Sequence, residues 1–147
     1  MTAEGFENLP GTPMRSGAIT ISPQEKLLLA EVLGSEPTEG TALHPLHPYI
    51  IAQRGIDESI ADICAFADFS IDDGPMMGSL ELDLTAETHA GVEYTVEGEI
   101  VDLIRKEGAK RGAFDLLTYR ERVIDPSGRT VATATNTFVL FRKAEQA

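Results

Sequence analysis

Hydrophobic residues change their spacing along the chain, from a helical repeat in the first half to strict alternation in the second. Ser22-Pro23-Gln24-Glu25 has the form of a capping box with proline at the first helical position, and it predicts a helix over residues 22–33 that stops at Gly34. The apolar run at residues 17–21 predicts a short strand before this helix. Residues 35–42 are small, polar and turn-forming, and they predict a connecting loop.

A second helical repeat follows two His-Pro pairs. Apolar residues recur at helical spacing, while the acidic residues between them fall elsewhere on the helical wheel; the apolar set is Ile56, Ile60, Ile63, Cys64 and Ala67. This pattern predicts one long helix over residues 48–69. Because Cys64 lies on the apolar face without a nearby cysteine partner, we expect a buried hydrophobe in a reducing compartment.

From residue 76 onward the pattern has a period of two. Leu80, Leu82 and Leu84 alternate with acidic residues, and a similar alternation runs through residues 92–104. Two further strands, residues 113–124 and 129–141, are joined by the turn sequence Asp-Pro-Ser-Gly at residues 125–128. Long antiparallel strands need an apolar cover, so the sequence predicts an α+β fold in which a curved antiparallel sheet wraps around the long central helix.

Length and charge narrow the class of protein. The chain has 147 residues, enough for one domain with a sizeable core, and we expect an irregular arm at 1–15, a single domain at 16–142 and a tail at 143–147. With 24 acidic and 12 basic residues the net charge is −12, which disfavours nucleic acid and membrane surfaces as partners. The sequence has no signal-like segment or membrane-length apolar run, so a cytoplasmic protein is expected.

The predicted order of elements resembles the hot-dog fold and, more narrowly, the MaoC-like family of hydratases and dehydratases. The resemblance covers about residues 16–142 and is closest to single hot-dog subunits of the N-terminal-half type. It rests on HPLHPYIIAQRG (44–55), on GSLELDLTAETHAGVEYTVEGEIVDLIRK (78–106) and on the hairpin RERVIDPSGRTVATATNTFVL (120–140).

The resemblance implies reversible, (R)-specific addition of water to a 2-enoyl thioester of coenzyme A or of an acyl-carrier protein. It implies no separate cofactor, because coenzyme A or pantetheine arrives as part of the substrate. An unpaired edge of the curved sheet favours association, so we expect a homodimer or a heterodimer with a related hot-dog subunit.

The resemblance also suggests catalytic residues. Family members use an Asp and a His five residues later to activate water, and Glu39 and His44 have this spacing with Glu in place of Asp. Related β-hydroxyacyl dehydratases place the carboxylate fourteen residues after the histidine, an interval that His44 and Glu58 share. In the same scheme a glycine N–H polarises the thioester carbonyl, and Gly55 is the expected donor.

Two groups of residues are candidates for substrate binding. His44 and His47 each precede a proline at the start of the long helix, where free backbone N–H groups and an imidazole together would receive a thioester carbonyl. The alternative is that both His-Pro pairs are only part of a connecting loop and have no role in binding. The second group is a basic segment that would hold coenzyme A or pantetheine phosphates, or would be an ordinary solvated turn: Arg105, Lys106, Lys110 and Arg111.

Three functions therefore stay open at the level of the sequence. The first is a working hydratase or dehydratase in which His44, with Glu39 or Glu58, moves the proton. The second is a catalytically silent subunit that shapes the acyl pocket while a related partner carries the catalytic pair. The third is a thioesterase in which Glu58 or Asp62 activates water. Activity of the chain alone separates the first two, and release of free thiol identifies the third.

Overall fold

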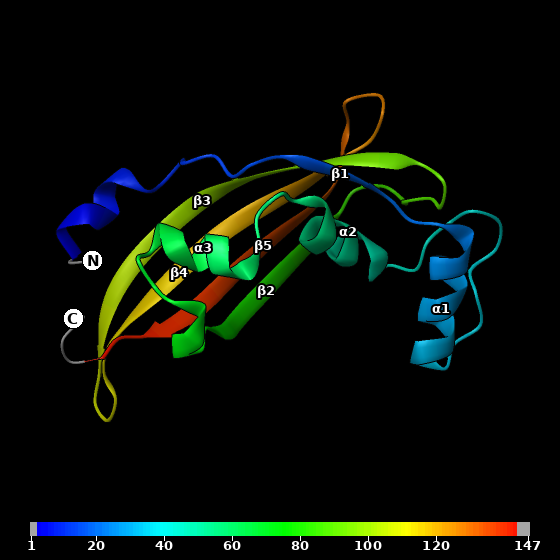
Figure 1. Ribbon diagram of the computed structural model, residues 1–147. Helices are drawn as coiled ribbons and strands as arrows, with labels where there is room; N and C mark the ends of the chain where they lie inside the picture. Colours follow the sequence, from blue (N-terminus) through cyan, green and yellow to red (C-terminus); the bar gives the residue numbers. More distant parts are fainter. Residues whose placement is uncertain (1–2, 144–147) are drawn as a thin grey trace.

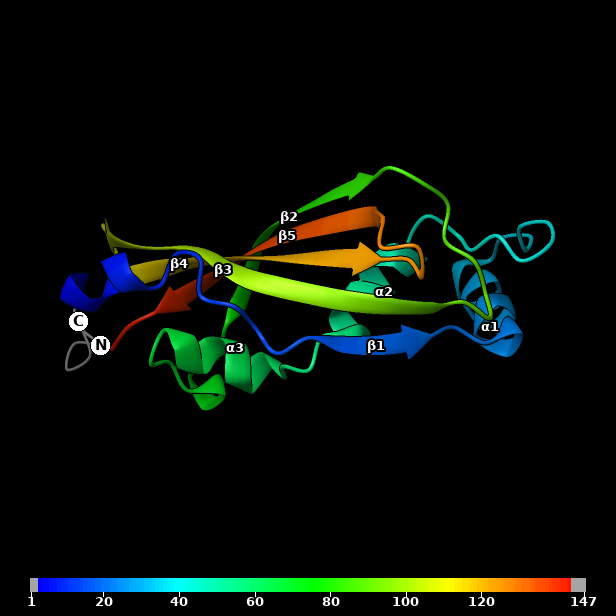
Figure 2. The same ribbon diagram turned by 90° about the horizontal axis from the view of Figure 1, so that it is seen from above.

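A five-stranded antiparallel sheet curves around two short helices in the computed structural model, which describes residues 3–143 (Figures 1 and 2). The strand order across the sheet is β1-β3-β4-β5-β2, so that β1 and β2 form its edges. The strands are β1 (Gly17–Thr20), β2 (Met76–Leu84), β3 (Glu93–Gly108), β4 (Gly112–Ile124) and β5 (Thr130–Phe141). The predicted α+β architecture with a curved antiparallel sheet is confirmed.

The period-two pattern fixes which side of each strand faces the core. In β4 every second residue from Ala113 to Val123 is buried, and the residues between them are partly exposed on the convex side. β5 alternates in the same way and pairs with β4 through a register that places Tyr119 beside Asn136. The predicted turn at residues 125–128 is present, and the Asp125 carboxylate closes it by accepting hydrogen bonds from the backbone N–H groups of Ser127 and Arg129.

The first helix, α1 (Pro23–Leu33), forms as its capping signals predict. The Ser22 hydroxyl accepts from the Glu25 N–H while the Glu25 carboxylate accepts from the Ser22 N–H, and Gly34 ends the helix in the left-handed conformation. α1 lies beside the sheet rather than under it (Figure 1), and only Lys26 and Ala30 of this helix are buried.

The predicted long central helix is instead two helices on the concave face, α2 (His47–Gly55) and α3 (Ile60–Phe66). Extended backbone at Ile56 ends α2. A second capping box starts α3, because the Ser59 hydroxyl accepts from the Asp62 N–H and the Asp62 carboxylate accepts from the Ser59 N–H. The apolar repeat continues across this break, so hydrophobic spacing alone did not reveal it. Cys64 of α3 is buried as predicted, and burial raises the pKa of its thiol.

The N-terminal arm is ordered against the sheet. It contains a 3₁₀ helix, η1 (Ala3–Asn8), and its Phe6 and Met14 side chains are buried in the core. Its backbone follows β3, with the Gly11 N–H donating to the Ile100 carbonyl at 2.7 Å and the Met14 N–H donating to the Gly98 carbonyl at 2.8 Å. A second 3₁₀ helix, η2 (Ile71–Asp73), precedes β2. Of the expected tail at 143–147, only Lys143 lies within the described residues.

Within residues 3–143, no helix has both the length and the apolar character needed to cross a membrane.

Candidate functional site

The start of α2 does not offer the free N–H groups that the sequence suggested. The His47 N–H donates to the His44 carbonyl at 2.8 Å, and the N–H groups of Tyr49 and Ile50 both donate to the Leu46 carbonyl. Pro48 has no N–H to give. The first turn of α2 is therefore closed on itself, and a thioester carbonyl would find no spare backbone donor there.

His44 lies in the loop before α2 and is partly exposed. Its ring Nδ1 accepts a hydrogen bond from the Leu46 N–H at 3.1 Å. A neutral imidazole that accepts at Nδ1 carries its proton on Nε2. In this arrangement the other ring nitrogen of His44, Nε2, is a hydrogen-bond donor, whereas a general base would need an unprotonated nitrogen facing the water.

His47 is buried at the first position of α2, only 2% exposed. Its Nδ1 has no hydrogen-bond partner among the described residues. Burial lowers the pKa of His47 because it disfavours the charged ring, nearby His44 adds repulsion, and Glu25 opposes the change. His47 is therefore a neutral core residue at neutral pH, and nothing in its surroundings exposes it to a substrate.

An open groove of about 740 Å³ lies between the loop that follows α1 and the residues at the end of β2. Glu39, Pro45 and Pro48 form one wall, and residues 84–88 form the other. Lys26 fixes the loop from inside, because its Nζ donates to the carbonyl oxygens of Thr38 and Gly40. Glu39 is exposed in this groove, and among residues 3–143 no hydrogen bond or ion pair joins it to His44.

Glu58 is held by an arginine rather than by a histidine. It lies in the linker between α2 and α3, and its carboxylate accepts from the Arg15 N–H at 3.1 Å and pairs with the Arg15 guanidinium at 3.2 Å. The same guanidinium pairs with Asp62 at 3.1 Å, and Asp62 also caps α3. Capping and the arginine lower the pKa of Asp62. Both carboxylates thus fasten the helices to the segment before β1.

Gly55 ends α2 at a point of close packing. A Cβ atom at Gly55 would lie 2.5 Å from the Val96 Cγ2 atom, and one at Gly17 would lie 2.0 Å from the Gly55 carbonyl oxygen. The C-terminal end of a helix presents carbonyl groups rather than free N–H groups. Close packing therefore accounts for a glycine at position 55. That the Gly55 N–H polarises the thioester carbonyl stays a prediction.

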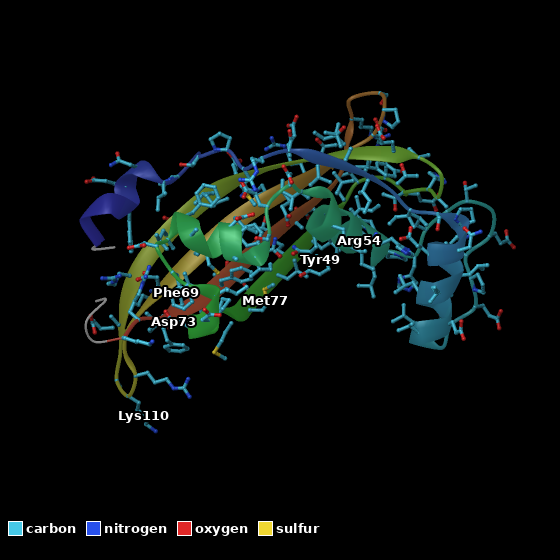
Figure 3. All side chains as sticks on the ribbon, in the orientation of Figure 1. Tyr49, Arg54, Phe69, Asp73, Met77 and Lys110 are labelled. Carbon is cyan, nitrogen blue, oxygen red and sulfur yellow. The ribbon has the colours of Figure 1, made fainter. Side chains whose placement is uncertain are left out.

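The basic segment divides into one structural residue and an exposed tip. The Arg105 guanidinium binds the buried carboxylate of Asp115 at 2.8 Å, and Arg142 binds the same carboxylate at 2.8 Å. Lys106, Lys110 and Arg111 are exposed around the turn between β3 and β4. Lys110 projects from this turn, at the end of the sheet opposite α1 and the groove (Figure 3). β3 has 16 residues and spans about 50 Å, so the tip and the groove do not form one compact site.

A cluster of buried polar side chains that the sequence pattern did not indicate lies beneath α2. Glu121 of β4 and Asn136 of β5 are both fully buried. The Glu121 Oε1 atom accepts from the Gln53 amide of α2 at 3.0 Å and from the Asn136 amide at 3.1 Å. Burial raises the pKa of Glu121 to about 8, against a smaller opposing effect of the Asn136 hydrogen bond. At neutral pH this side chain is mainly an uncharged carboxylic acid.

Two oxygen atoms of this cluster have no hydrogen-bond partner among the described residues, Glu121 Oε2 and Tyr119 Oη. Tyr119 is two positions before Glu121 on β4 and is also fully buried. Burial, followed by the nearby Glu121, raises the pKa of Tyr119. Gln53 lies close enough to oppose part of this rise, but the two groups lack hydrogen-bond geometry. Within the described part of the chain, no three His, Cys, Asp or Glu residues gather as a metal site requires.

The β2 edge of the sheet is apolar and uncovered. Met77 and Leu80 are 49% and 43% exposed, and Leu84 is 44% exposed. These residues pair with Phe138, Asn136 and Ala132 of β5, so they share the concave side of the sheet with α2. Figure 3 shows Met77 on β2 and Tyr49 on α2 along this side. An exposed apolar edge strand is a typical surface for pairing with another chain.

No protein-family model matches the sequence, and no curated protein matches it. Solved structures do match over most of this chain. A MaoC-like dehydratase from Rhodospirillum rubrum is 18% identical, with a TM-score of 0.61 over 94% of this chain and 97% of the other. Both a HadBC (3R-hydroxyacyl-ACP dehydratase) complex and the ChsH1-ChsH2 complex, from Mycobacterium tuberculosis, give TM-scores of 0.69.

The HadBC match has 12% identity and covers 89% of this chain and 96% of the other, and the ChsH1-ChsH2 match has 13% identity and covers 90% and 84%. Identities this low establish the fold alone. The chain therefore has the hot-dog fold, as the sequence resemblance predicted, and its structural neighbours include two dehydratases and two complexes of different chains.

Proposed function

We propose that this chain is one subunit of a hot-dog hydratase or dehydratase that acts on 2-enoyl or 3-hydroxyacyl thioesters. In this proposal the chain shapes and binds the acyl group, and a related hot-dog subunit supplies the acid and base. The proposal rests on the contacts that His44, Glu39 and Glu58 make. His44 accepts at Nδ1 from the backbone, Glu58 is bound to Arg15, and Glu39 makes no described contact with His44.

Water addition needs a base for the water O–H and an acid for the α-carbon, both directed at one substrate. The three candidate residues lie in separate places: Glu39 on the groove wall, His44 beside the backbone of Leu46, and Glu58 beneath Arg15. Because neither of these two carboxylates contacts the His44 imidazole within residues 3–143, we place the proton transfers on the partner.

The open β2 edge supports the partner part of the proposal. Met77, Leu80 and Leu84 leave an apolar strip along the edge strand and the concave side of the sheet. A second hot-dog subunit paired there would cover the strip and extend the sheet. HadBC and ChsH1-ChsH2, which share this fold, are described as complexes. Coenzyme A or a carrier-bound pantetheine belongs to the substrate in this proposal, and the exposed tip of Lys106, Lys110 and Arg111 stays a candidate for its phosphates.

A second candidate function is catalysis by this chain itself. Glu39 is exposed in the groove, and the loop that carries it also carries His44 five residues later. Rotation of the His44 ring away from the Leu46 N–H would free Nδ1 for proton transfer. Thioester hydrolysis has less support, because Glu58 and Asp62 are both engaged by Arg15.

The test is an assay of the purified chain with a 2-enoyl-CoA, alone and mixed with a related hot-dog chain. We expect the chain alone to bind the thioester without hydrating it, and the mixture to hydrate it at a rate that His44→Ala and Glu39→Gln leave unchanged. Hydration by the chain alone, reduced about a hundredfold or more by His44→Ala, would instead establish the second candidate. Free thiol measured in the same samples detects hydrolysis.

A further inference from the structure

Tyr119 and Glu121 place two hydroxyl-bearing groups on the same buried face of β4. They occupy successive inward positions of β4, and both side chains are fully buried. Their outer oxygen atoms, Tyr119 Oη and Glu121 Oε2, have no hydrogen-bond partner among the described residues. An unpaired buried polar atom costs about 1–3 kcal/mol, so two of them from neighbouring positions call for a physical explanation.

The hydrogen bonds of Glu121 determine which of its oxygens carries the proton. Oε1 accepts two N–H groups, from Gln53 and Asn136, and an oxygen in this position acts as the carbonyl oxygen of a neutral acid. The proton of the neutral acid is therefore on Oε2. Tyr119 stays protonated because burial raises its pKa. Two O–H donors thus lie on the same buried face of β4, two residues apart, and neither has a described acceptor.

We propose that Tyr119 and Glu121 form a two-donor site for an uncharged carbonyl oxygen carried by the acyl group, some distance from the thioester. The proposal rests on the proposed function, since it takes the acyl thioester as the ligand, and it narrows the substrates to oxo-acyl groups. A neutral carboxylic acid held in apolar surroundings can donate a hydrogen bond at neutral pH, and a tyrosine beside it supplies a second donor. Two such donors match the two lone pairs of one carbonyl oxygen.

The β2 edge lies two strands from this pair on the same side of the sheet. In the sheet register Leu80 lies beside Asn136, which lies beside Tyr119, and Leu82 lies beside Ala134, which lies beside Glu121. The two donors are thus two strands, or about 10 Å, from the apolar edge that α2 leaves uncovered. An alkyl chain lying along Leu80 and Leu82 would bring an oxygen to the pair, while its thioester end stays near the surface.

The surroundings favour an uncharged ligand. The titratable groups that face Glu121 are Tyr119 on its own strand and Tyr49 on α2, while Cys64 on α3 faces Tyr119, and all are neutral when protonated. Burial raises the pKa of each of these groups. No described arginine or lysine binds this carboxyl, unlike Asp115 with its two arginines. A carboxylate ligand would therefore enter without a counter-charge, whereas a ketone needs only the two hydrogen bonds.

The experiment uses a medium-chain methyl ketone with a carbon-13 carbonyl and the alkane of equal length, added to the intact protein. We expect the ketone to bind more tightly than the alkane and its infrared carbonyl band to shift to lower frequency on binding. Tyr119→Phe should weaken ketone binding about fivefold to tenfold, the usual effect of one neutral hydrogen bond, and leave alkane binding unchanged. Tyr94→Phe is the matched control, because the Tyr94 hydroxyl is buried elsewhere and accepts from the His89 N–H.

Glu121→Gln keeps the experiment decisive if other variants fold poorly, because glutamine retains an acceptor and a donor of the same shape. Ketone binding should weaken above a pH of about 8 in the unmodified protein, where Glu121 loses its proton, and should not change with pH in Glu121→Gln. Equal affinity for ketone and alkane, an unshifted carbonyl band, or no effect of Tyr119→Phe would each overturn the proposal and leave an internal water as the acceptor.

A parallel measurement with saturated and oxo-substituted acyl-CoA separates this proposal from the proposed function. Tighter binding of the oxo-acyl-CoA, lost in Tyr119→Phe, supports both. A ketone that binds through Tyr119 while neither acyl-CoA binds would retain the carbonyl site and reject the thioester as its ligand.

Discussion

Glu121 is protonated because β4 places its side chain in the core, although its neighbours in the sequence suggest a charged residue on the surface. Arg120 and Arg122 flank it, and in isolation the run Arg-Glu-Arg is typical of a charged surface. Strand geometry sends both arginines to the convex side, where Arg122 pairs with Glu97, and sends Glu121 into the core. Its partners Gln53 and Asn136 are far away in sequence, so only the folded register shows that a carboxyl is buried there.

This burial makes stability depend on pH. The ordinary pKa of a glutamate is near 4.5, and that of Glu121 in the folded protein is about 8. Between these values the folded state retains a proton that the unfolded state has lost, so the free energy of unfolding falls as pH rises. The contribution of Glu121 is fully present below a pH of about 4.5, is lost progressively up to about 8 and then stays constant.

We expect Glu121→Gln to remove this dependence. The variant should be more stable than the unmodified protein at pH 8, by a few kcal/mol, and the difference should shrink toward pH 5. Chemical denaturation at a series of pH values measures it. Glu31→Gln, on the exposed part of α1, is the control and should parallel the unmodified protein throughout. A constant difference between Glu121→Gln and the unmodified protein at every pH would show that the folded carboxyl ionises normally.

At the scale of elements, local signals predicted those helix ends and turns whose stabilising hydrogen bonds join residues only a few positions apart. The capping box at Ser22 and the turn at residues 125–128 are examples. The break between α2 and α3 also has a local signal, Ser59 followed by Asp62, but the apolar repeat continues through it and favoured one helix. The break leaves Glu58 in a linker, where Arg15 binds it.

The contact between α2 and the sheet depends on Gly17 of β1 and Gly55 of α2. A Cβ atom at Gly17 would lie 2.0 Å from a backbone carbonyl oxygen of α2, which no side-chain rotation relieves. We therefore expect Gly17→Ala to destabilise the protein by about 2 kcal/mol or more, as overpacked core positions do. Gly98→Ala is the matched comparison in the same sheet. Its Cβ would meet the flexible Met14 Sδ atom at 2.9 Å and the Arg120 carbonyl oxygen at 3.1 Å, contacts milder than one at 2.0 Å, so its cost should be smaller.

Thermal and chemical denaturation of the two variants measure this difference. Equal loss of stability in Gly17→Ala and Gly98→Ala would mean that α2 can move away from β1 without cost, contrary to the close packing of Gly17 against Gly55.

For the whole molecule, the sequence predicted a curved antiparallel sheet with a helical cover because alternation, turns and helix repeats each specify an element independently. The hot-dog fold itself was predicted from the resemblance of this order of elements to a known family. The candidate site was harder to predict, because it depends on how distant elements meet. His44 and Glu39 are near in sequence yet make no described contact, and Lys110 lies at the end of the sheet opposite the groove. Spacing along the chain carries no information about these separations.

The unpaired β2 edge leads to a prediction about assembly. Its exposed apolar residues would stay in water in a single subunit, and pairing with a second hot-dog subunit would bury them together with the free backbone groups of β2. We expect the protein to be a dimer at micromolar concentration in light scattering, either with itself or with a related chain. Met77→Lys, which puts a charge in the strip, should shift the protein toward monomer without unfolding it.

Leu28→Lys is the matched control, because Leu28 is 55% exposed on α1, away from the sheet edge. It should leave the dimer intact. If the unmodified protein is a monodisperse monomer with and without a related hot-dog chain, the β2 edge is not an interface. The acyl chain would then have no second subunit to enclose it along Leu80 and Leu82. The proposal that this chain binds the acyl group while a partner supplies the acid and base would also be wrong.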